Sequence, residues 1–362
     1  RICLVGSEMC IRDSSNAAPI LSLTTTSKSY TEGDGAVVLD SSGIGITDSD
    51  NATMASAQVQ ITNPVSEDVL TATGNGTISV TAYDATTGIL ALTGSDTVAN
   101  YATVLQSVKY ENTNTNNPSE TTRSLSWTVN DGATSSAAVT TTIAVTGVND
   151  APALSLATST QAFSEGSTTP VALDTSSSST LTDVDNANLT GATVKISTAT
   201  LTSSEDVLAM TNTGSITGSY VSSTGTLTLS GTDSLANYLT ALQTVTYLNS
   251  NGTNPSTTAR VIEWTVTDGT TSSTTITTQV TITPNNDAPA LSLGSNTLTY
   301  TEASGAQTLD SSSSLQITDA DNTNMASAQV KITNPVSEDV LTATGNGTIS
   351  VTAYDATTGI LA

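Results

Sequence analysis

Internal repetition is the feature of this sequence that most constrains its fold. The string Asn149-Asp150-Ala151-Pro152 recurs as Asn286-Asp287-Ala288-Pro289, and Trp127 recurs as Trp264, each at an offset of 137 residues. A period of this length suits an independent domain and is too long for a solenoid repeat. We therefore expect a non-native or disordered head over 1–16, a first repeat over 17–150, a second over 151–287 and a truncated third over 288–362.

The third copy is closely related to the first but is shorter. Residues 54–91 and 325–362 differ at one position only, where Gln60 corresponds to Lys331, whereas the second copy diverges from both. The third copy has no counterpart of residues 92–148. We expect that residues 288–362 cannot hold a stable sandwich alone, because their sheets would have open edges and an uncovered apolar face.

Composition and hydrophobic pattern both predict strands. Thr and Ser are the two commonest residue types, Val and Ile add further β-branched side chains, and hydrophobic residues make up 36% of the chain. Alternation with polar residues, as at Ala192, Val194 and Ile196, marks strands with one buried face. Many short strands between Gly and Asn turns indicate an all-β fold of tandem antiparallel β-sandwiches. Trp127 and Trp264 alternate with core positions, so we interpret them as core residues rather than ligand platforms.

One segment of each complete copy breaks the strand pattern. Asp233 is followed by Leu235, Leu239 and Leu242, which share one face at helical spacing. We expect a short helix that is capped by Asp233 in the second copy and by Asp96 in the first.

The charge of the chain argues against several classes of function. Lys and Arg number 8 against 32 Asp and Glu, which gives a net charge of −24. Such a polyanion repels nucleic acid and anionic lipid, so we expect no nucleic-acid partner and no direct membrane insertion. The sequence has no histidine, the commonest general base, and its cysteines, Cys3 and Cys10, both lie in the head. Because the same carboxylates recur in every copy, we expect that the chain is not an enzyme.

The head is unlike the rest of the chain. Residues 3–13 resemble the conceptual translation of a transposase adapter used to build sequencing libraries, whose common end encodes Met9 to Asp13. We therefore leave the head out of the fold, as for other non-native segments.

The end of each complete copy resembles the end of a cadherin repeat. Residues 127–132 read Trp-Thr-Val-Asn-Asp-Gly, and residues 147–152 read Gly-Val-Asn-Asp-Ala-Pro after one further strand. The sequence is most similar to the bacterial cadherin-like tandem repeats of large surface adhesins, which share the Asn-Asp-Ala-Pro joint. The resemblance implies cadherin-like or Ig-like sandwiches with Ca2+ at the joints, in a secreted or surface-anchored extracellular protein. Such an array acts as a semi-rigid spacer or in cell adhesion, and its partners are neighbouring repeats and a cell-surface protein or glycan.

The resemblance also assigns calcium ligands, and Asp, Glu and Asn supply the oxygens that this hard cation prefers. The first joint would use Glu32, Asn149, Asp150, Asp183, Asp185 and Asp268. The second would use Glu165, Asn286, Asp287, Asp319 and Asp321, while Asp48, Asp50 and Asp131 would face an upstream repeat. The cadherin Asp-Arg-Glu motif has no evident counterpart, and the candidate substitute is Glu67-Asp68, which recurs as Glu205-Asp206 and Glu338-Asp339.

Two alternatives stay open at this point. The acidic motifs could be ordinary turns, since Asp, Asn and Gly form Asx hydrogen bonds without any metal. The repeats could also be non-catalytic carbohydrate-binding or accessory modules of a secreted polysaccharide-degrading enzyme. That function needs exposed aromatic side chains, and aromatic residues make up only 3% of the chain.

Overall fold

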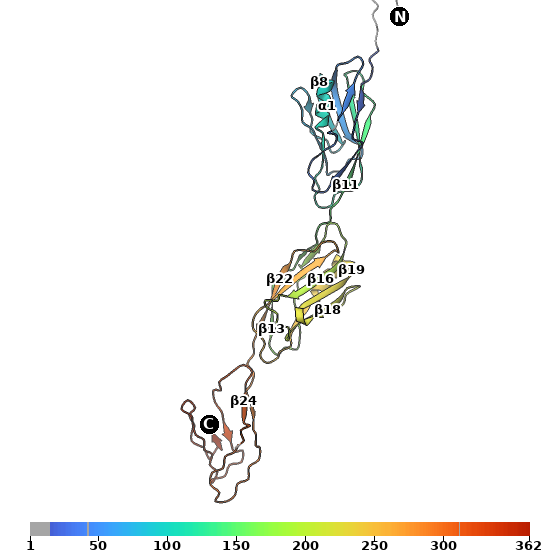
Figure 1. The fold of residues 1–362 in the computed structure, drawn as a ribbon. Helices are drawn as coiled ribbons and strands as arrows, with labels where there is room; N and C mark the ends of the chain where they lie inside the picture. Colours follow the sequence, from blue (N-terminus) through green and yellow to red (C-terminus); the bar gives the residue numbers. More distant parts are fainter. Residues whose placement is uncertain (1–14, 42, 311) are drawn as a thin grey trace, which may run out of the picture.

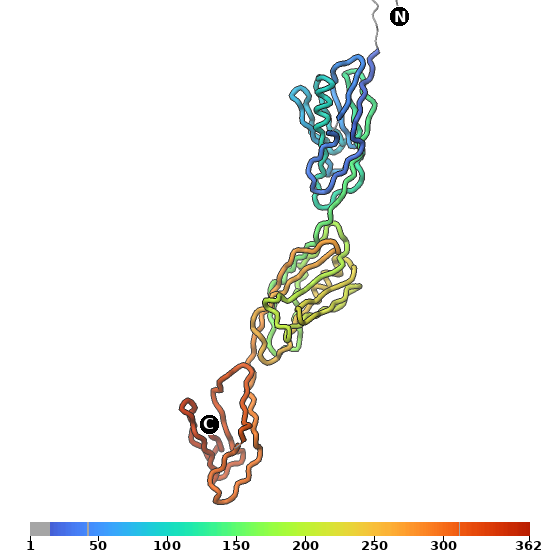
Figure 2. Tube along the Cα trace, viewed as in Figure 1, coloured from blue at the N-terminus to red at the C-terminus, as the bar shows by residue number. Residues whose placement is uncertain are grey.

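The computed structural model describes residues 15–362 except Ser42 and Ser311. The segment that resembles a sequencing adapter therefore lies outside the described residues. The described chain forms three units that follow one another end to end (Figure 1). We call them repeat 1 (17–150), repeat 2 (151–287) and unit 3 (288–362). The tube in Figure 2 shows that the three units do not intertwine and that the chain passes once from each to the next.

Repeat 1 is a β-sandwich with one six-stranded sheet. In spatial order its strands are β2 (Ser27–Thr31), β11 (Val139–Thr146), β10 (Arg123–Asn130), β5 (Thr53–Ile61), β8 (Ile89–Thr97) and β7 (Ser79–Val80). The facing layer contains β3 (Val37–Val38), β9 (Lys109–Asn112) and β6 (Asp68–Thr71), together with the pair β1 (Ile20–Ser22) and β4 (Gly45–Thr47). Most strands are short and separated by turns, as the sequence pattern predicts.

Repeat 2 has the same strand order. Its large sheet contains β13 (Thr160–Ser164), β22 (Ile276–Thr283), β21 (Arg260–Thr267), β16 (Asn188–Ile196), β19 (Thr226–Ser234) and β18 (Thr217–Val221). The facing layer contains β14 (Val171–Ala172), β20 (Thr246–Asn249) and β17 (Asp206–Ala209), with the pair β12 (Ala153–Ser155) and β15 (Thr180–Thr182). A 3-10 turn over Ser222–Thr224 connects β18 to β19. The all-β tandem sandwich fold predicted from the sequence is therefore confirmed.

One strand pair in each repeat departs from the expected antiparallel pairing. β2 runs parallel to β11, with Tyr30 opposite Val145, and β13 runs parallel to β22, with Phe163 opposite Ile282. The chain enters each repeat at one end and leaves at the other (Figure 1), so its first and last long strands must run in the same direction. This pairing is what allows the repeats to follow one another along one line.

Each repeat has its own hydrophobic core. One cluster of buried side chains lies wholly within repeat 1 and a second lies wholly within repeat 2. Trp127 and Trp264 are fully buried at their centres, which confirms their interpretation as core residues. Along β16, Ala192, Val194 and Ile196 all point inward. Buried apolar area of this kind is the main favourable term in the stability of each sandwich.

The two expected helices are present, but each begins one residue later than predicted. α1 spans Val98–Gln106 and α2 spans Leu235–Gln243, and their N-caps are Thr97 and Ser234. The prediction that Asp96 and Asp233 are the caps is therefore wrong. β19 continues through Asp233, and the Asp233 carboxylate instead accepts hydrogen bonds from the Ser234 N–H and the Asn237 side chain.

The buried face of α2 also differs from the expectation. Tyr238, Ala241 and Leu242 are buried, whereas Leu235 and Leu239 are only partly buried against the core. The helix lies against β15 and β19 at the edge of the sandwich, so its central turn faces the core more directly than its ends. The hydroxyl of Tyr238 donates a 2.5 Å hydrogen bond to the Gly231 carbonyl and so satisfies its polar end.

Unit 3 has little regular structure among its described residues. Its strands are β23 (Ala290–Ser292), β24 (Gln316–Thr318), β25 (Val330–Lys331) and β26 (Ile360–Leu361). Tyr300 is 64% exposed, whereas its counterpart Tyr30 in repeat 1 is 1% exposed. The same difference separates Leu309 at 52% from Leu39 at 1%. Side chains that form a core in repeat 1 therefore face solvent in unit 3.

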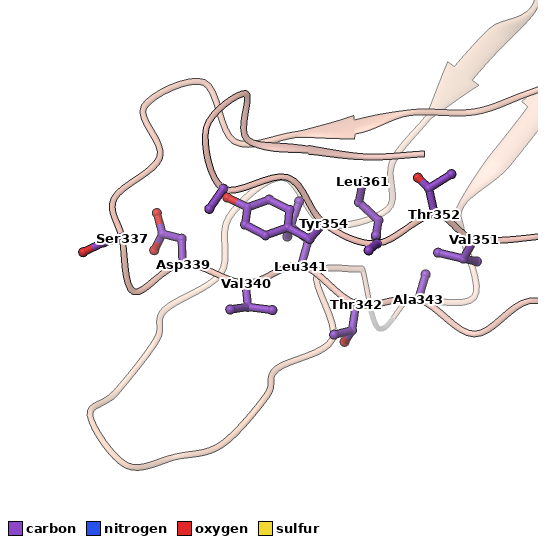
Figure 3. Close-up of a pocket in the computed structure, with 12 residues that line it drawn as sticks. Ser337, Asp339, Val340, Leu341, Thr342, Ala343, Val351, Thr352, Tyr354 and Leu361 are labelled. Atoms are coloured by element: carbon purple, nitrogen blue, oxygen red, sulfur yellow. The ribbon is translucent and has the colours of Figure 1, made fainter.

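An open pocket marks the place where the core of unit 3 is incomplete. Leu341, Tyr354 and Leu361 line it together with the carboxylate of Asp339 (Figure 3). The counterpart of this segment in repeat 1 is β6, which pairs with β9 along its whole length. Unit 3 contains no counterpart of β9, so this strand edge and the apolar side chains beside it stay uncovered.

Candidate metal sites at the joints between repeats

The linker between repeats 1 and 2 is bonded to carboxylates of both repeats. The Val148 N–H donates a 2.7 Å hydrogen bond to Glu32 Oε2 of repeat 1. The Asp150 N–H donates a 2.6 Å hydrogen bond to Asp185 Oδ2 of repeat 2. The three consecutive residues 148–150 therefore bring carboxylates from two separate sandwiches to one joint.

Asn149 extends this network within repeat 2. Its amide Nδ2 lies 2.8 Å from Asp268 Oδ2, and its Oδ1 accepts a 2.8 Å hydrogen bond from Asn186 Nδ2. All six residues predicted for the first joint thus belong to one region. It is built by the ends of β2 and β11 in repeat 1, and by the Asp-x-Asp-Asn turn after β15 and the turn after β21 in repeat 2.

The Asp-x-Asp-Asn turn uses one oxygen of its first aspartate for its own structure. Asp183 Oδ1 accepts hydrogen bonds from the N–H groups of Asp185 at 3.0 Å and Asn186 at 2.8 Å. This is the Asx geometry of the turn interpretation. The other oxygen, Asp183 Oδ2, is buried and has no hydrogen-bond partner among the described residues. The turn and metal interpretations are therefore compatible, because each uses a different oxygen.

Buried oxygens without a partner recur at every joint. Within the described part of the chain, six carboxylates leave one oxygen buried and without a hydrogen bond. One of them, Asp174, was not predicted as a calcium ligand, and the other five were: Glu32, Asp48, Glu165, Asp183 and Asp287. An ionised oxygen that is removed from water without a partner is costly. A bound cation would remove that cost at each of these positions.

The second joint repeats this geometry. The Asn285 N–H donates to Glu165 Oε2 and the Asp287 N–H donates to Asp321 Oδ2, both at 2.6 Å. Glu165, Asp287 and Asp321 each offer a carboxylate oxygen, and these atoms lie within 4.8 Å of one another. Because calcium–oxygen distances are about 2.3–2.6 Å, two ligands of one ion lie at most about 5 Å apart. The three oxygens are therefore close enough to share one ion.

Asn286 and Asp319 complete the second joint. Asn286 Oδ1 accepts a 3.0 Å hydrogen bond from Asn322 Nδ2. Asp319 Oδ1 accepts the N–H groups of Asp321 and Asn322, as Asp183 does in repeat 2. Since this turn lies in unit 3, it forms the Asx geometry without a complete sandwich behind it.

The outer end of repeat 1 carries a third site of the same kind. Asp48 Oδ1 accepts the N–H groups of Asp50 and Asn51, and Asp131 Oδ2 accepts Asn16 Nδ2 at 2.8 Å. The Ala17 N–H donates to Asp50 Oδ2, as Asp150 does to Asp185 in the first joint.

Asn16 was missed by the sequence analysis, which placed it in the head. Asn16-Ala17-Ala18-Pro19 is the counterpart of Asn149-Asp150-Ala151-Pro152, with Ala17 in place of an aspartate. The spacing to Asp48, Asp50 and Asn51 is the signal that identifies it. This end therefore lacks the carboxylate that Asp150 supplies at the first joint.

Hydrogen bonding keeps two of the joint carboxylates, Asp268 and Asp131, ionised. Desolvation raises the pKa of Asp268, but hydrogen bonds from the Asn149 amide and from the Thr271 and Thr270 N–H groups outweigh it and lower that pKa to about 2. The Thr134 N–H and the Asn16 amide lower the pKa of Asp131. These side chains therefore carry negative charge at any physiological pH.

The carboxylates of Asp68 and Asp206 form buried ion pairs within their own repeats. Asp68 is fully buried and bonded to Arg123, and Asp206 is bonded in the same way to Arg260. The hypothesis that these two aspartates substitute for the Asp-Arg-Glu motif is therefore wrong. Glu67 Oε1 accepts a 2.6 Å hydrogen bond from the Ser119 N–H.

Glu120 was missed as well. Its Oε1 accepts the Gly147 N–H at 2.8 Å, so it lies at the same linker as Glu32. A Cβ on Gly147 would lie 3.4 Å from Glu120 Oε1 and 3.7 Å from Glu32 Oε2. The counterpart of Glu120 in repeat 2 is Thr257, so comparison of the copies could not reveal it.

Comparison with known proteins adds similarities of structure alone. No protein-family model and no curated protein matches the chain. Protocadherin Gamma B7 extracellular cadherin domains 1-4 match at 13% identity and a TM-score of 0.34, over 84% of this chain and 60% of that one. Mouse Cadherin-23 EC22-24 matches at 12% identity and a TM-score of 0.29, over 96% and 88%. The C-terminal domain of the Streptococcus agalactiae AgI/II polypeptide BspA matches at 10% identity and a TM-score of 0.23, over 72% and 99%.

The fold and the joints together define the class: a tandem array of β-sandwich repeats with acidic joints. Cadherin extracellular domains are among the solved structures to which the array is similar, and the chain spans 60% of the Protocadherin Gamma B7 structure. Among the described residues, no helix is long and apolar enough to cross a membrane.

Proposed function

We propose that this chain is a calcium-binding tandem-repeat segment of a bacterial extracellular adhesin and acts as a semi-rigid spacer or cell-adhesion array. The observation that supports this function most strongly is the set of buried carboxylate oxygens without hydrogen-bond partners, because five of the six described ones belong to residues predicted as ligands. Calcium takes six to eight oxygen ligands, and carboxylates and amide carbonyls are suitable donors. We propose no catalytic function, because the same carboxylates recur in each repeat.

The proposed calcium sites would act on the stiffness of the array. In the first joint, Glu32, Asp150, Asp183, Asp185 and Asp268 would contribute five negative charges. Neighbouring carboxylates a few Å apart repel by about 1 kcal/mol per pair even at the dielectric constant of water. Without a cation this repulsion favours opening of the joint, and a bound divalent ion offsets it and holds both repeats to one point.

The proposed setting is outside the cell. Extracellular calcium modules bind with dissociation constants of about 10⁻⁴–10⁻³ M, which suits body fluids or seawater. The partners we propose are the neighbouring repeats and a cell-surface protein or glycan. A net charge of −24 disfavours nucleic acid. Both tryptophans, Trp127 and Trp264, are fully buried, which disfavours the alternative of a carbohydrate-binding module.

Calcium titration of the full chain tests this function. We expect calcium to narrow the distribution of molecular dimensions in small-angle scattering and to raise the melting temperature by mass action. The double substitution Asp183→Ala with Asp185→Ala should abolish the response of the first joint. The matched control is Asp84→Ala with Asp355→Ala, which removes two turn carboxylates away from the joints. If the unmodified chain has the same scattering profile and melting temperature in chelator and in millimolar calcium, the proposal is wrong.

A further inference from the structure

A loop at the end of each complete repeat contacts the next unit without involving a carboxylate. Asn117, between β9 and β10, donates from Nδ2 to the Val184 carbonyl of repeat 2 at 2.6 Å. Asn254, between β20 and β21, donates from Nδ2 to the Ala320 carbonyl of unit 3, also at 2.6 Å. Val184 and Ala320 are the middle residues of the two Asp-x-Asp turns. The same contact therefore occurs at both joints, at equivalent residues.

We propose that Asn117 and Asn254 are positioning residues that form a metal-independent latch across each joint. The latch holds the Asp-x-Asp turn of the following unit in place and so presents its carboxylates to the cation. Its role in calcium binding depends on the function proposed above, whereas its effect on the angle between repeats does not.

The loop that carries the latch is held rigid by its own side chains. Asn114 Oδ1 accepts the N–H groups of Asn116 and Asn117, and Asn114 Nδ2 donates to the Asn117 carbonyl at 2.6 Å. Asn251 makes the same three contacts with Thr253 and Asn254 in repeat 2. In each repeat the following proline is buried. The loop is therefore organised before it meets the next unit, which lowers the entropic cost of the contact.

The loop is also anchored to the buried ion pair of its own repeat. Glu67 accepts the Ser119 N–H directly after the loop, and it lies 3.6 Å from Arg123. In repeat 2 the corresponding Glu205 accepts Asn251 Nδ2 at 3.0 Å and lies 3.5 Å from Arg260. This gives the glutamate that recurs in the Glu-Asp pair of each copy a role at the joint: it supports the latch loop rather than the metal.

The acceptor of the latch hydrogen bond is a backbone carbonyl and not a side chain. The middle residue of the turn is Ser49, Val184 or Ala320 in the three copies. A hydrogen bond to its carbonyl tolerates this variation. Since Asp183 Oδ1 holds the N–H groups that follow Val184, a fixed carbonyl at Val184 also fixes the direction of the free Asp183 Oδ2.

The latch changes the mechanics of the joint. The linker alone is a single covalent connection, about which the repeats would swing when the carboxylates repel. The Asn117 contact to the Val184 carbonyl adds a second attachment to the Asp-x-Asp turn, besides the one from the Asp150 N–H to Asp185. Two attachments restrict the swing to a smaller range of angles. We therefore expect partial order between repeats even in chelator.

Distance measurements between spin labels test the latch in the full chain. The labels are placed at Thr142 and Thr228, exposed positions in repeats 1 and 2, with Cys3 and Cys10 replaced by serine. In chelator we expect Asn117→Ala to broaden the distance distribution measurably. Asn117→Asp, which keeps the shape but replaces the donor with a negative charge, should broaden it at least as much.

Asn116→Ala is the matched control for these variants. It removes the same kind of side chain one residue earlier, and within the described part of the chain that side chain makes no hydrogen bond to repeat 2. Its distribution should equal that of the unmodified protein. Equal distributions for the unmodified protein and both Asn117 variants in chelator would overturn the latch.

Calcium provides the second arm of the experiment. Added calcium should narrow the Asn117→Ala distance distribution again, but at a calcium concentration about twofold higher than for the unmodified protein. This factor corresponds to the lower end of the free energy that one hydrogen bond contributes. If calcium has no effect on any of the variants, the proposed calcium function fails, and the latch is still judged by the chelator arm. If Asn117→Ala broadens the distribution but calcium narrows it at an unchanged concentration, the positioning role is wrong.

Discussion

The Nε atom of Arg123 lies 2.9 Å from both carboxylate oxygens of Asp68, and both side chains are fully buried. The Tyr110 hydroxyl donates a 2.7 Å hydrogen bond to Asp68 Oδ1. Arg260 and Asp206 repeat this pair in repeat 2 at the same distances. Both charges of this buried pair are removed from solvent. Each is therefore compensated only while its partner is present.

The first prediction concerns this buried pair. Arg260→Met should destabilise repeat 2 by about 3–5 kcal/mol, because it leaves the Asp206 carboxylate buried and uncompensated. Hydrogen exchange measures this, with repeat 1 in the same chain as an internal reference. The double variant Arg260→Met with Asp206→Leu should recover part of the loss, since the unpaired charge is gone. Unchanged protection in repeat 2 of the single variant would contradict the prediction.

The second prediction concerns the start of α2 and its pH dependence. Hydrogen bonds from the Ser215 N–H, the Asn237 side chain and the Ser234 N–H lower the pKa of Asp233 from 3.8 to about 2. A carboxylate with a lowered pKa in the folded state stabilises that state above its unfolded pKa. This contribution is lost as the pH falls from about 3.8 towards about 2.

Two variants separate the charge from the cap. Asp233→Asn should lower the melting temperature of repeat 2 near neutral pH, and its difference from the unmodified protein should shrink below about pH 3.8. Ser234→Ala removes the N-cap hydroxyl and should cost about 1 kcal/mol at every pH. Melting followed by Trp264 fluorescence measures both. A pH-independent difference for Asp233→Asn would show that its charge is not involved.

The third prediction uses the near-identity of two segments in different surroundings. Residues 61–91 in repeat 1 and 332–362 in unit 3 have the same sequence. In repeat 1 this segment packs into a complete sandwich, whereas in unit 3 Val340 and Ile349 are 70% and 63% exposed. Peptides common to both should therefore show two isotope populations after hydrogen exchange, one protected and one exchanged, in about equal amounts.

The isolated fragment 288–362 supplies the control for this experiment. We expect it to show no cooperative melt, because the strand edge equivalent to β6 and the apolar face beside it have no cover. A single protected population in the full chain, or a cooperative transition of the fragment, would contradict the prediction.

Much of the fold could be predicted from local patterns. The alternation around Ala192 and Val194 predicted β16, and the spacing after Asp233 predicted α2. The parallel pairing of β2 with β11 could not be predicted in this way, because it depends on where the chain enters and leaves the sandwich. The N-cap at Ser234 was missed because strand β19 continues one residue further than the propensity of Asp233 suggests.

At the joints too, some residues could be predicted from the sequence and others could not. Every residue predicted at the first joint lies there, because repeated Asp-x-Asp and Asn-Asp motifs mark turns that can be recognised in each copy. Glu120 could not be identified by comparing the copies, since repeat 2 has a threonine at that position. Asp68 was assigned to the wrong environment, because a sequence does not state that Arg123 will be buried beside it.

The sequence by itself determined the repeat unit, its strands and helix, and the acidic turns at its ends, because all of these depend on local periodicity and on the turn chemistry of a few adjacent residues. Only the tertiary structure decided which carboxylate oxygens have partners. Arg123 and Asp68 are 55 positions apart, Asn117 and Val184 are 67 apart, and each pair meets only after the strands have packed. Whether an aspartate ends in an ion pair, an Asx turn or a cation site depends on burial and on neighbours that are distant in the chain.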